Sequence, residues 1–312
     1  MAFAGRSSDI PTPLSTEKTI RTSVQTIPVP AFSDLSKAAN DLINKDFYHT
    51  QAANLEVKLK APNGTAITVK GKQGFDSTTT ASLEGKYTLK EQGVTITQSW
   101  TTAALLDSKV EFTDVFSQPV KAELQNLWNP NAPQKGAQKL NLTFKLPNSH
   151  ARAFIDRSAS GNVSAILDAV VGHEGFLVGA EAGYDVQKAA VTRYAAAAGY
   201  AAPTYTASIT GTQNLSVIAA SFYQKVNSNV EAGAKATYDL QGNNNVGLEV
   251  AGKYKIDPTS FAKAKINDRG IAALAYNTKL NPGATLGLGL SLDTAKLNEA
   301  GHKIGTSLTF EG

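Results

Sequence analysis

The chain has 312 residues, of which 42% are hydrophobic and 18% charged, a composition that excludes a disordered or collagen-like protein. It contains no cysteine, which excludes disulfides, thiolate zinc sites and cysteine nucleophiles, and its four histidines lack the i, i+4 spacing of a metal-binding helix. The formal net charge of +4 is far below that of a nucleic-acid-binding surface, so we expect no nucleic-acid partner.

The hydropathy pattern excludes one kind of membrane protein and leaves another open. No stretch approaches about 20 consecutive apolar residues, so a transmembrane helix is excluded. A closed β-barrel is the other backbone arrangement that satisfies its hydrogen bonds in lipid. Its signal is an alternation of apolar and polar residues, and a mean hydropathy of −0.19 is compatible with it.

Residues 1–28 are rich in Ser, Thr and Pro and show no apolar periodicity. Basic, hydroxyl-rich leaders are typical of targeting presequences, which is one interpretation of this segment. Asp9, Glu17 and the prolines argue against a helical leader. We therefore predict a disordered N-terminal extension over 1–28.

The segment 31–45 has the periodicity of an amphipathic helix. Its apolar residues recur at steps of three and four, which places them on one face: Phe32, Leu35, Ala38, Ala39, Leu42 and Ile43. A charged stripe lies opposite, formed by Asp34, Lys37, Asp41 and Lys45. The apolar face is short and the stripe has no net charge, so we expect the helix to pack on the rest of the fold and not on a membrane surface.

From about residue 55 onward the pattern has period two. Leu55, Val57 and Leu59 alternate with charged residues, and a Pro-Asn-Gly turn follows at 62–64. We divide the rest of the chain into 19 such segments, each taking about 14 residues with its turn, which fits a membrane-crossing strand. They lie near 55–60, 65–71, 81–89, 94–100, 108–113, 120–124, 138–145, 150–156, 163–171, 176–184, 190–200, 204–210, 215–223, 229–238, 246–254, 260–266, 271–280, 285–292 and 303–310.

Two all-β interpretations fit this pattern, a soluble binding protein with an apolar core and a membrane barrel with an apolar outer face. The evenness of the pattern favours the barrel, since domain boundaries would bring longer connections. Aromatic residues near segment ends also favour it, as in the interfacial girdle of a barrel: Tyr87, Trp100, Tyr184, Tyr200, Tyr223, Tyr238, Tyr254, Tyr276 and Phe310.

The charged positions of the alternating segments are candidates for the lining of a pore. Their neighbours on the same segments are mostly apolar, so the charges are predicted to face the lumen at Glu56, Glu84, Lys58, Lys60, Lys86, Lys121, Lys139 and Lys145. Residues 29–312 hold 27 basic and 24 acidic residues, so we expect only a weak preference for anions. A merely solubilising role stays open for any single lysine.

No enzyme motif accompanies this pattern. Gly287 and Gly289 form an isolated pair within an alternating segment, without the third glycine and the helix of a dinucleotide site. The scattered Asp and His residues show no nucleophile–base arrangement. We expect no catalytic residues, no cofactor and no metal, and we therefore expect that the protein is not an enzyme.

Several motifs carry a resemblance to a known family. The segment 29–47, Val171-Gly-His-Glu-Gly-Phe-Leu-Val-Gly179 and Tyr184-Asp-Val-Gln-Lys188 resemble the helix and the middle of mitochondrial porins, the voltage-dependent anion channels, in their fungal form. Tyr254-Lys-Ile-Asp-Pro-Thr-Ser260 and Ala264-Lys-Ile-Asn-Asp268 are similar to the signature of that family. The end of the chain has the form of the sorting signal of mitochondrial barrels, with Lys303, Gly305, Leu308 and Phe310 at its defining positions.

The resemblance implies a 19-stranded transmembrane β-barrel over 48–312, in the mitochondrial outer membrane, with the helix of 29–47 inside the pore. The odd strand number implies that 55–60 and 303–310 pair in parallel. The implied function is a voltage-gated, weakly anion-selective diffusion channel for ATP, ADP, phosphate and small ions. The helix charges Lys37, Lys45, Asp34 and Asp41 would line the pore and sense voltage together with Lys58, Lys60, Lys86 and Lys121.

The resemblance also implies partners and leaves alternatives open. Outer-membrane lipids and the barrel-insertion machinery are the expected partners, and self-association is left open. A protein-import barrel of the same fold is the main alternative function, and a soluble binding protein is the other. Two family features do not carry over, because the lipid-facing glutamate and the helix arginine of animal members fall on Gln98 and Asn40.

Overall fold

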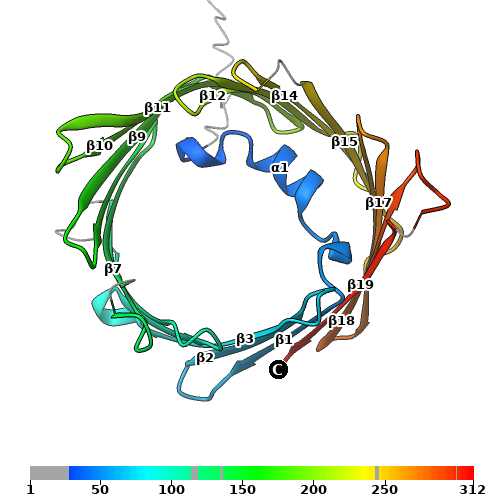
Figure 1. Cartoon of the computed structure of the whole chain (residues 1–312), viewed down its shortest axis with the longest axis horizontal. Helices are drawn as coiled ribbons and strands as arrows, with labels where there is room; N and C mark the ends of the chain where they lie inside the picture. Colours follow the sequence, from blue (N-terminus) through cyan, green and yellow to red (C-terminus); the bar gives the residue numbers. More distant parts are fainter. Residues whose placement is uncertain (1–27, 114–118, 134–135, 243–245, 300) are drawn as a thin grey trace, which may run out of the picture.

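The computed structural model describes residues 28–113, 119–133, 136–242, 246–299 and 301–312, and almost all of the extension predicted over 1–28 lies outside these ranges. Within them, 19 strands form one sheet that closes on itself as a barrel (Figure 1). No helix among these residues is long and apolar enough to cross a membrane.

The strand bounds agree with the predicted segments to within a few residues, and the segments with the weakest alternation, 108–113, 120–124 and 150–156, are strands as well. In chain order the strands are β1 (Ala53–Lys60), β2 (Ala66–Gln73), β3 (Thr79–Leu89), β4 (Val94–Thr101), β5 (Leu106–Phe112), β6 (Val120–Trp128), β7 (Ala137–Leu146), β8 (Ser149–Ser158), β9 (Val163–His173), β10 (Phe176–Asp185), β11 (Ala190–Ala201), β12 (Tyr205–Thr212), β13 (Val217–Lys225), β14 (Val230–Asp239), β15 (Val246–Lys255), β16 (Ser260–Asn267), β17 (Ile271–Asn281), β18 (Ala284–Asp293) and β19 (Lys303–Glu311).

The barrel closes through a parallel pair. β1 pairs with β19 from Ala53 opposite Thr306 to Lys58 opposite Glu311, whereas every other neighbouring pair is antiparallel. An odd number of strands joined by hairpins requires one parallel contact on closure. The predicted parallel pairing of 55–60 with 303–310 is confirmed.

The alternation of side chains separates an outer from an inner face. Large apolar side chains of the outer face are exposed, for example Leu83 at 52%, Leu167 at 60% and Val178 at 63%. Exposed apolar surface on this scale is unusual for a protein in water and is what a lipid-facing wall requires. The buried apolar residues lie inside the barrel, where the N-terminal segment contacts the wall.

The N-terminal segment runs through the lumen in three short helical pieces: η1 (Phe32–Asp34), α1 (Lys37–Asn44) and η2 (Tyr48–Thr50) (Figure 1). The fourth helical piece, η3 (Lys90–Gln92), lies in the connection between β3 and β4. The prediction of one continuous helix over 31–45 is wrong at its start, because the chain turns at Leu35 and Ser36. The turn lets Phe32 and Leu35 pack on one part of the wall and Leu42 and Ile43 on another.

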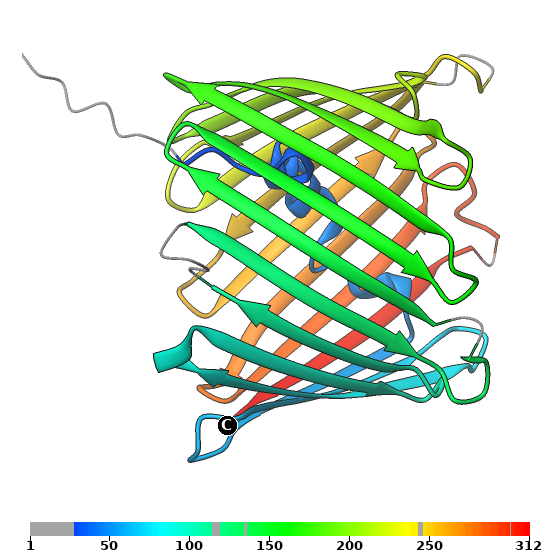
Figure 2. The same ribbon diagram turned by 90° about the vertical axis from the view of Figure 1, so that its left-hand side faces the viewer.

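The two rims of the barrel differ in what they carry. The C terminus, Val29 and the connection between β9 and β10 lie at one rim, which we call the first rim (Figure 2). The connections between β4 and β5, β6 and β7, and β8 and β9 lie at the other, the second rim. Of the aromatic residues predicted for the girdle, Tyr223 is an exception, because it lies on the inner face and packs against Leu42 and Ile43.

Candidate permeation pathway

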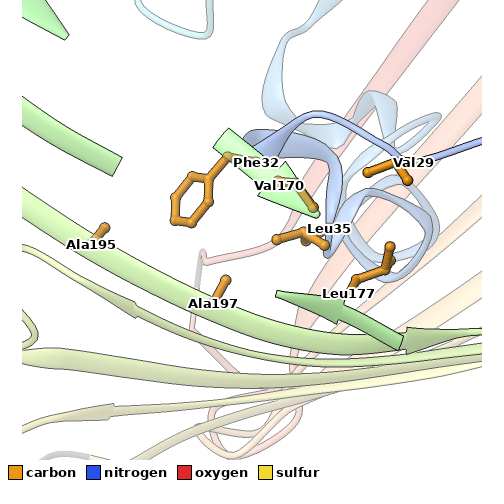
Figure 3. Packing of buried hydrophobic residues seen from close by; sticks show 7 residues of the cluster. All are labelled: Val29, Phe32, Leu35, Val170, Leu177, Ala195 and Ala197. Atoms are coloured by element: carbon orange, nitrogen blue, oxygen red, sulfur yellow. The ribbon is translucent and has the colours of Figure 1, made fainter. Parts of the chain in front are cut away.

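The first contact between the N-terminal segment and the wall is an apolar cluster near the first rim. Val29, Phe32 and Leu35 pack against inner-face residues of β9, β10 and β11 (Figure 3). The wall residues of this cluster are Val170, Leu177, Ala195 and Ala197, and Val170 is completely buried. Burial of these side chains stabilises η1 on the wall at about 25 cal/mol for each Å² of apolar surface removed from water.

Two further clusters continue the contact along the segment. Leu42 and Ile43 pack with Ala251 and the ring of Tyr223, and Ile43 is completely buried. Phe47 packs with Ala273 and Ala275 on β17. The apolar face predicted for 31–45 is therefore the face that contacts the wall, except for Ala38, which is half-buried beside the charged stripe. With Phe47 included, the partners of the segment extend from β9 to β17.

Small wall residues allow the segment to approach the strands closely. A Cβ atom at Gly179 would lie 3.0 Å from Cδ2 of Phe32, and one at Gly233 would lie 2.9 Å from Cδ2 of Leu42. Both distances are shorter than ordinary van der Waals contact, so a larger residue at either position would force the side chain of Phe32 or Leu42 to shift.

A buried lysine fixes the end of α1. The Nζ of Lys263 on β16 donates hydrogen bonds to the carbonyl oxygens of Lys45, at 2.7 Å, and Asp41, at 3.2 Å. It also lies 3.6 Å from a carboxylate oxygen of Asp46, and its side chain is only 2% exposed. A cation is favourable at this position because the last carbonyl groups of a helix lack partners within the helix.

Three more polar contacts tie the segment to the wall along its length. The Nζ of Lys235 donates to Oδ1 of Asn40 at 3.0 Å. The hydroxyl of Tyr48 donates to Oδ1 of Asn277 at 3.0 Å. Nδ1 of His150 lies 3.3 Å from the carbonyl oxygen of Val29. Asn40 stands where the animal members have an arginine in the helix, and here it contacts the wall through Lys235.

The charged stripe of the helix faces away from this wall, toward the lumen. Lys37 lies 4.0 Å from Asp34 and 3.8 Å from Asp41, and Lys45 lies 2.7 Å from Asp41. All four side chains keep between 36% and 59% of their surface exposed. These ion pairs are partly hydrated, so each contributes little to stability and the charges remain open to the aqueous path.

The wall that the helix leaves free, from β1 to β8, carries most of the lysines predicted for the pore. Strand registers place Lys58, Lys60, Lys86, Lys121, Lys139 and Lys145 on its inner face, with Glu56 and Glu84. Lys58 pairs with Glu311 at 2.9 Å, Lys121 with Glu111 at 3.3 Å, and Lys139 with Asp156 at 3.9 Å. In the described ranges, Lys60, Lys86 and Lys145 form no ion pair.

The four sorting-signal positions lie on the closing strand and divide between its faces. Leu308 and Phe310 are on the outer face, opposite Leu55 and Val57 of β1. Lys303 and Gly305 are on the inner face, and Gly305 lies directly against the backbone of η2, with no room for a Cβ atom. The glycine of this motif therefore also allows η2 to lie directly against the closing strand.

Several inner-face residues that hold the segment were not predicted from the sequence, above all Lys263, Lys235 and Tyr223. The alternation of Lys263 and Lys265 with Ala262, Ala264 and Ile266 was a signal for their inward direction. It did not indicate which strand would meet the helix. Among the described residues, no group of three or more His, Asp and Glu side chains could hold a metal ion.

Comparison with known proteins matches this chain to one family. The family model described as "Eukaryotic porin" matches residues 28–305. The mitochondrial outer membrane protein porin of Neurospora crassa is 58% identical over 283 residues, which cover 91% of this chain and 99% of that protein. The non-selective voltage-gated ion channel 1 of Saccharomyces cerevisiae is 38% identical over 284 residues, which cover 90% of this chain and 99% of that protein.

Proposed function

This chain belongs to the eukaryotic porins, and we propose that its lumen passes nucleotides, phosphate and small ions with a weak preference for anions. The protein is a voltage-gated channel of the mitochondrial outer membrane. The barrel and the channel relatives indicate a channel and not an enzyme. The permeants and the anion preference are the proposed part.

The observation that carries the proposal is the uneven charge of the open wall. The helical pieces of the N-terminal segment lie along the wall between β9 and β19, with one further contact from Val29 to His150 on β8, so solutes pass along β1 to β8 and the charged stripe of α1 (Figure 1). Of the inner-face charges named above, three lysines, Lys60, Lys86 and Lys145, and one acid, Glu84, form no ion pair among the described residues, so the unpaired charge of that wall is positive. A positive lining raises the local concentration of anions, and a surplus of only a few charges raises it weakly.

The same arrangement supports a role for the helix in gating. Phosphates and ions pass between the stripe and the wall lysines, so movement of α1 would change both the width and the charge of the path. A charge that crosses the whole membrane field contributes about 2.3 kcal/mol per 100 mV. We propose Asp34, Lys37, Asp41 and Lys45, with the wall lysines, as the charges on which voltage acts.

The closing strand supports the proposed partners. Leu308 and Phe310 present an apolar outer edge beside β1, which we propose as the surface that the barrel-insertion machinery recognises before the seam closes. Lipids of the outer membrane would surround the exposed apolar face.

The test of the anion preference is a reversal potential in a planar bilayer under a KCl gradient. Lys86→Glu changes an unpaired inner-face charge, whereas Lys90→Glu changes the same charge on η3 at the first rim. We expect Lys86→Glu to shift the reversal potential toward cation preference and Lys90→Glu to leave it nearly unchanged. Equal shifts for the two variants, or none for either, would contradict wall charge as the cause.

A further inference from the structure

The outer face of β4 to β8 carries a continuous row of polar side chains. The strand registers place Gln98 opposite Ser108, Ser108 opposite Asn126, Asn126 opposite Gln138, and Gln138 opposite Arg157. Gln98, Ser108 and Asn126 have apolar outer-face neighbours on both sides along their strands. Gln138 and Arg157 lie next to strand ends and have one each, Leu140 and Ile155. The row therefore crosses five neighbouring strands on a part of the outer face that is otherwise mostly apolar.

Arg157 is an exception in the charge distribution of the barrel. Among the described strands, every other Lys, Arg, Asp and Glu falls on the inner face, whereas Arg157 lies on the outer face between Gln138 and Val163. The neighbouring Asp156 is on the inner face and pairs with Lys139 at 3.9 Å. No ion pair within the described ranges includes Arg157, so no described side chain compensates its charge on the outer face.

The depth of the row is given by the two tryptophans of the chain. Trp100, Leu106 and Trp128 form the neighbouring outer-face row on the side of the second rim. Tryptophan is enriched where the hydrocarbon meets the headgroups. The polar row lies two residues deeper, about 7 Å along the strands, and Arg157 is one residue from the end of β8. An arginine is tolerated at this depth and strongly disfavoured at mid-membrane.

Two adjoining grooves meet at the unpartnered part of the row. One, of about 460 Å³, is lined by Val110, Leu124, Leu140 and Ile155, and the other, of about 270 Å³, extends toward the second rim beside Trp128. Asn126, Gln138 and Arg157 line both. The hydroxyl of Ser108 donates to Oε1 of Gln98 at 3.0 Å, whereas the side chains of Asn126, Gln138 and Arg157 make no hydrogen bond to another described residue.

We propose that this surface binds one anionic phospholipid. The guanidinium of Arg157 would pair with the phosphate diester, a geometry for which its planar donors are suited. The amide N–H groups of Asn126 and Gln138 would donate to phosphate or glycerol oxygens, and an acyl chain would lie along Leu124, Leu140 and Ile155. A free phosphate ion would meet the same donors but would leave the apolar groove unfilled.

Fluorescence quenching tests the proposal on the full chain, because the chain has only two tryptophans. Trp100→Phe leaves Trp128, which lines the groove, as the sole reporter. This variant is inserted into phosphatidylcholine bilayers that contain increasing fractions of brominated phosphatidylglycerol, brominated phosphatidylcholine or brominated diacylglycerol. We expect phosphatidylglycerol to be favoured over phosphatidylcholine near Trp128 by roughly three- to fivefold, the effect of one partly exposed ion pair.

Substitutions then assign the preference to Arg157. In the same background, Arg157→Gln should abolish the preference, Arg157→Lys should retain part of it, and Gln224→Leu, at an outer-face position near the first rim, should leave it unchanged. If the Arg157→Gln protein fails to insert, the double variant Asn126→Leu, Gln138→Leu keeps the charge of Arg157 and removes the amide donors. This double variant should lower the preference for phosphatidylglycerol about twofold.

Four results would overturn the proposal. Equal quenching by the two brominated phospholipids in the Trp100→Phe protein would show that the surface does not select the anionic lipid. An unchanged preference in Arg157→Gln would place the selecting group elsewhere. Displacement of phosphatidylglycerol by inorganic phosphate, or equally strong quenching by brominated diacylglycerol, would assign the site to a free ion or to the apolar groove alone.

Discussion

Replacement of Lys263 by methionine tests how the helix is held inside the pore. Methionine keeps the length and much of the packing of the side chain against Phe47, whose ring lies 5.0 Å from the ammonium nitrogen, but removes the charge and the donors. The carbonyl oxygens of Lys45 and Asp41 then lose a partner that reaches them at 2.7 and 3.2 Å from a side chain that is 2% exposed.

The size of the effect follows from these contacts. Hydrogen bonds to a charged group contribute about 1.5–3 kcal/mol each, and a cation at a helix C terminus adds about 0.3–2 kcal/mol. The cost of removing the ammonium from water offsets much of this sum. We therefore expect Lys263→Met to weaken binding of α1 to the wall by about 2 kcal/mol, which is roughly a 30-fold change in the equilibrium between bound and released helix.

A thiol placed under the helix measures that equilibrium. The chain has no cysteine, so Ala39→Cys introduces a single thiol at a position that is 1% exposed and faces the wall. A water-soluble thiol reagent can react only when α1 leaves the wall. The reaction should be about 30-fold faster with Lys263→Met than without it.

Lys265→Met is the matched control for this experiment. The ammonium of Lys265 lies 4.9 Å from the centre of the Phe47 ring, a cation–π contact worth about 0.5–1 kcal/mol at a partly exposed site. It makes no hydrogen bond to the backbone of α1 within the described ranges. We expect at most a fivefold increase in rate from this substitution. Equal rates with and without Lys263→Met, in channels of normal conductance, would refute the assignment of Lys263 as the group that holds the helix.

Three further predictions follow from the same geometry. Deletion of residues 1–45 removes η1 and α1, so the barrel should still insert but show a larger conductance or no voltage-dependent closure, and a deletion mutant that conducts and closes normally would contradict the position of the helix. Burial, with Lys265 and Lys303 nearby, lowers the pKa of His49 below its ordinary value of 6.5. Binding of η2 to the wall should therefore be complete above about pH 6.5 and weaken as the pH falls through the lowered pKa. The Ala39→Cys thiol should then react faster at low pH, and His49→Gln should remove this pH dependence of the reaction rate. Spin labels should contact lipid at outer-face positions and water at inner-face positions, and the opposite pattern would reverse the register: Val57, Tyr87 and Leu142 are outer, and Lys58, Lys86 and Lys145 are inner.

Local alternation was sufficient to predict the strands and the faces of their residues, although it left a soluble all-β protein open beside the barrel. A strand in this fold has lipid on one side and water on the other, so the polarity of a residue indicates which face it occupies. Apolar Leu55 is on the outer face and charged Glu56 on the inner face. The resemblance to the porin family added the closure and the position of the helix. Where the pattern was weak, as at 108–113, the segment was still a strand, because its neighbours supply the hydrogen bonds.

The contacts of the helix could not be predicted in the same way. They depend on which strands the segment crosses, and no periodicity encodes that. Tyr223 lies near the end of its strand, as a girdle residue would. Because neighbouring residues of a strand point to opposite faces and Phe222 points outward, Tyr223 points inward, toward Leu42. The break at Leu35 and Ser36 was not predicted either, because the apolar spacing from Phe32 to Leu42 is that of one continuous helix.

The charged stripe of α1 is predicted to border the aqueous path, and a single thiol on the stripe tests that position directly. Lys37→Cys places the only thiol of the chain on that stripe, at a side chain that is 54% exposed toward the lumen. Single channels of this variant in a planar bilayer are exposed to a negatively charged thiol reagent. We predict a stepwise fall in conductance and a shift of the reversal potential toward cations as each channel reacts. Complete labelling with unchanged conductance and selectivity would contradict the claim.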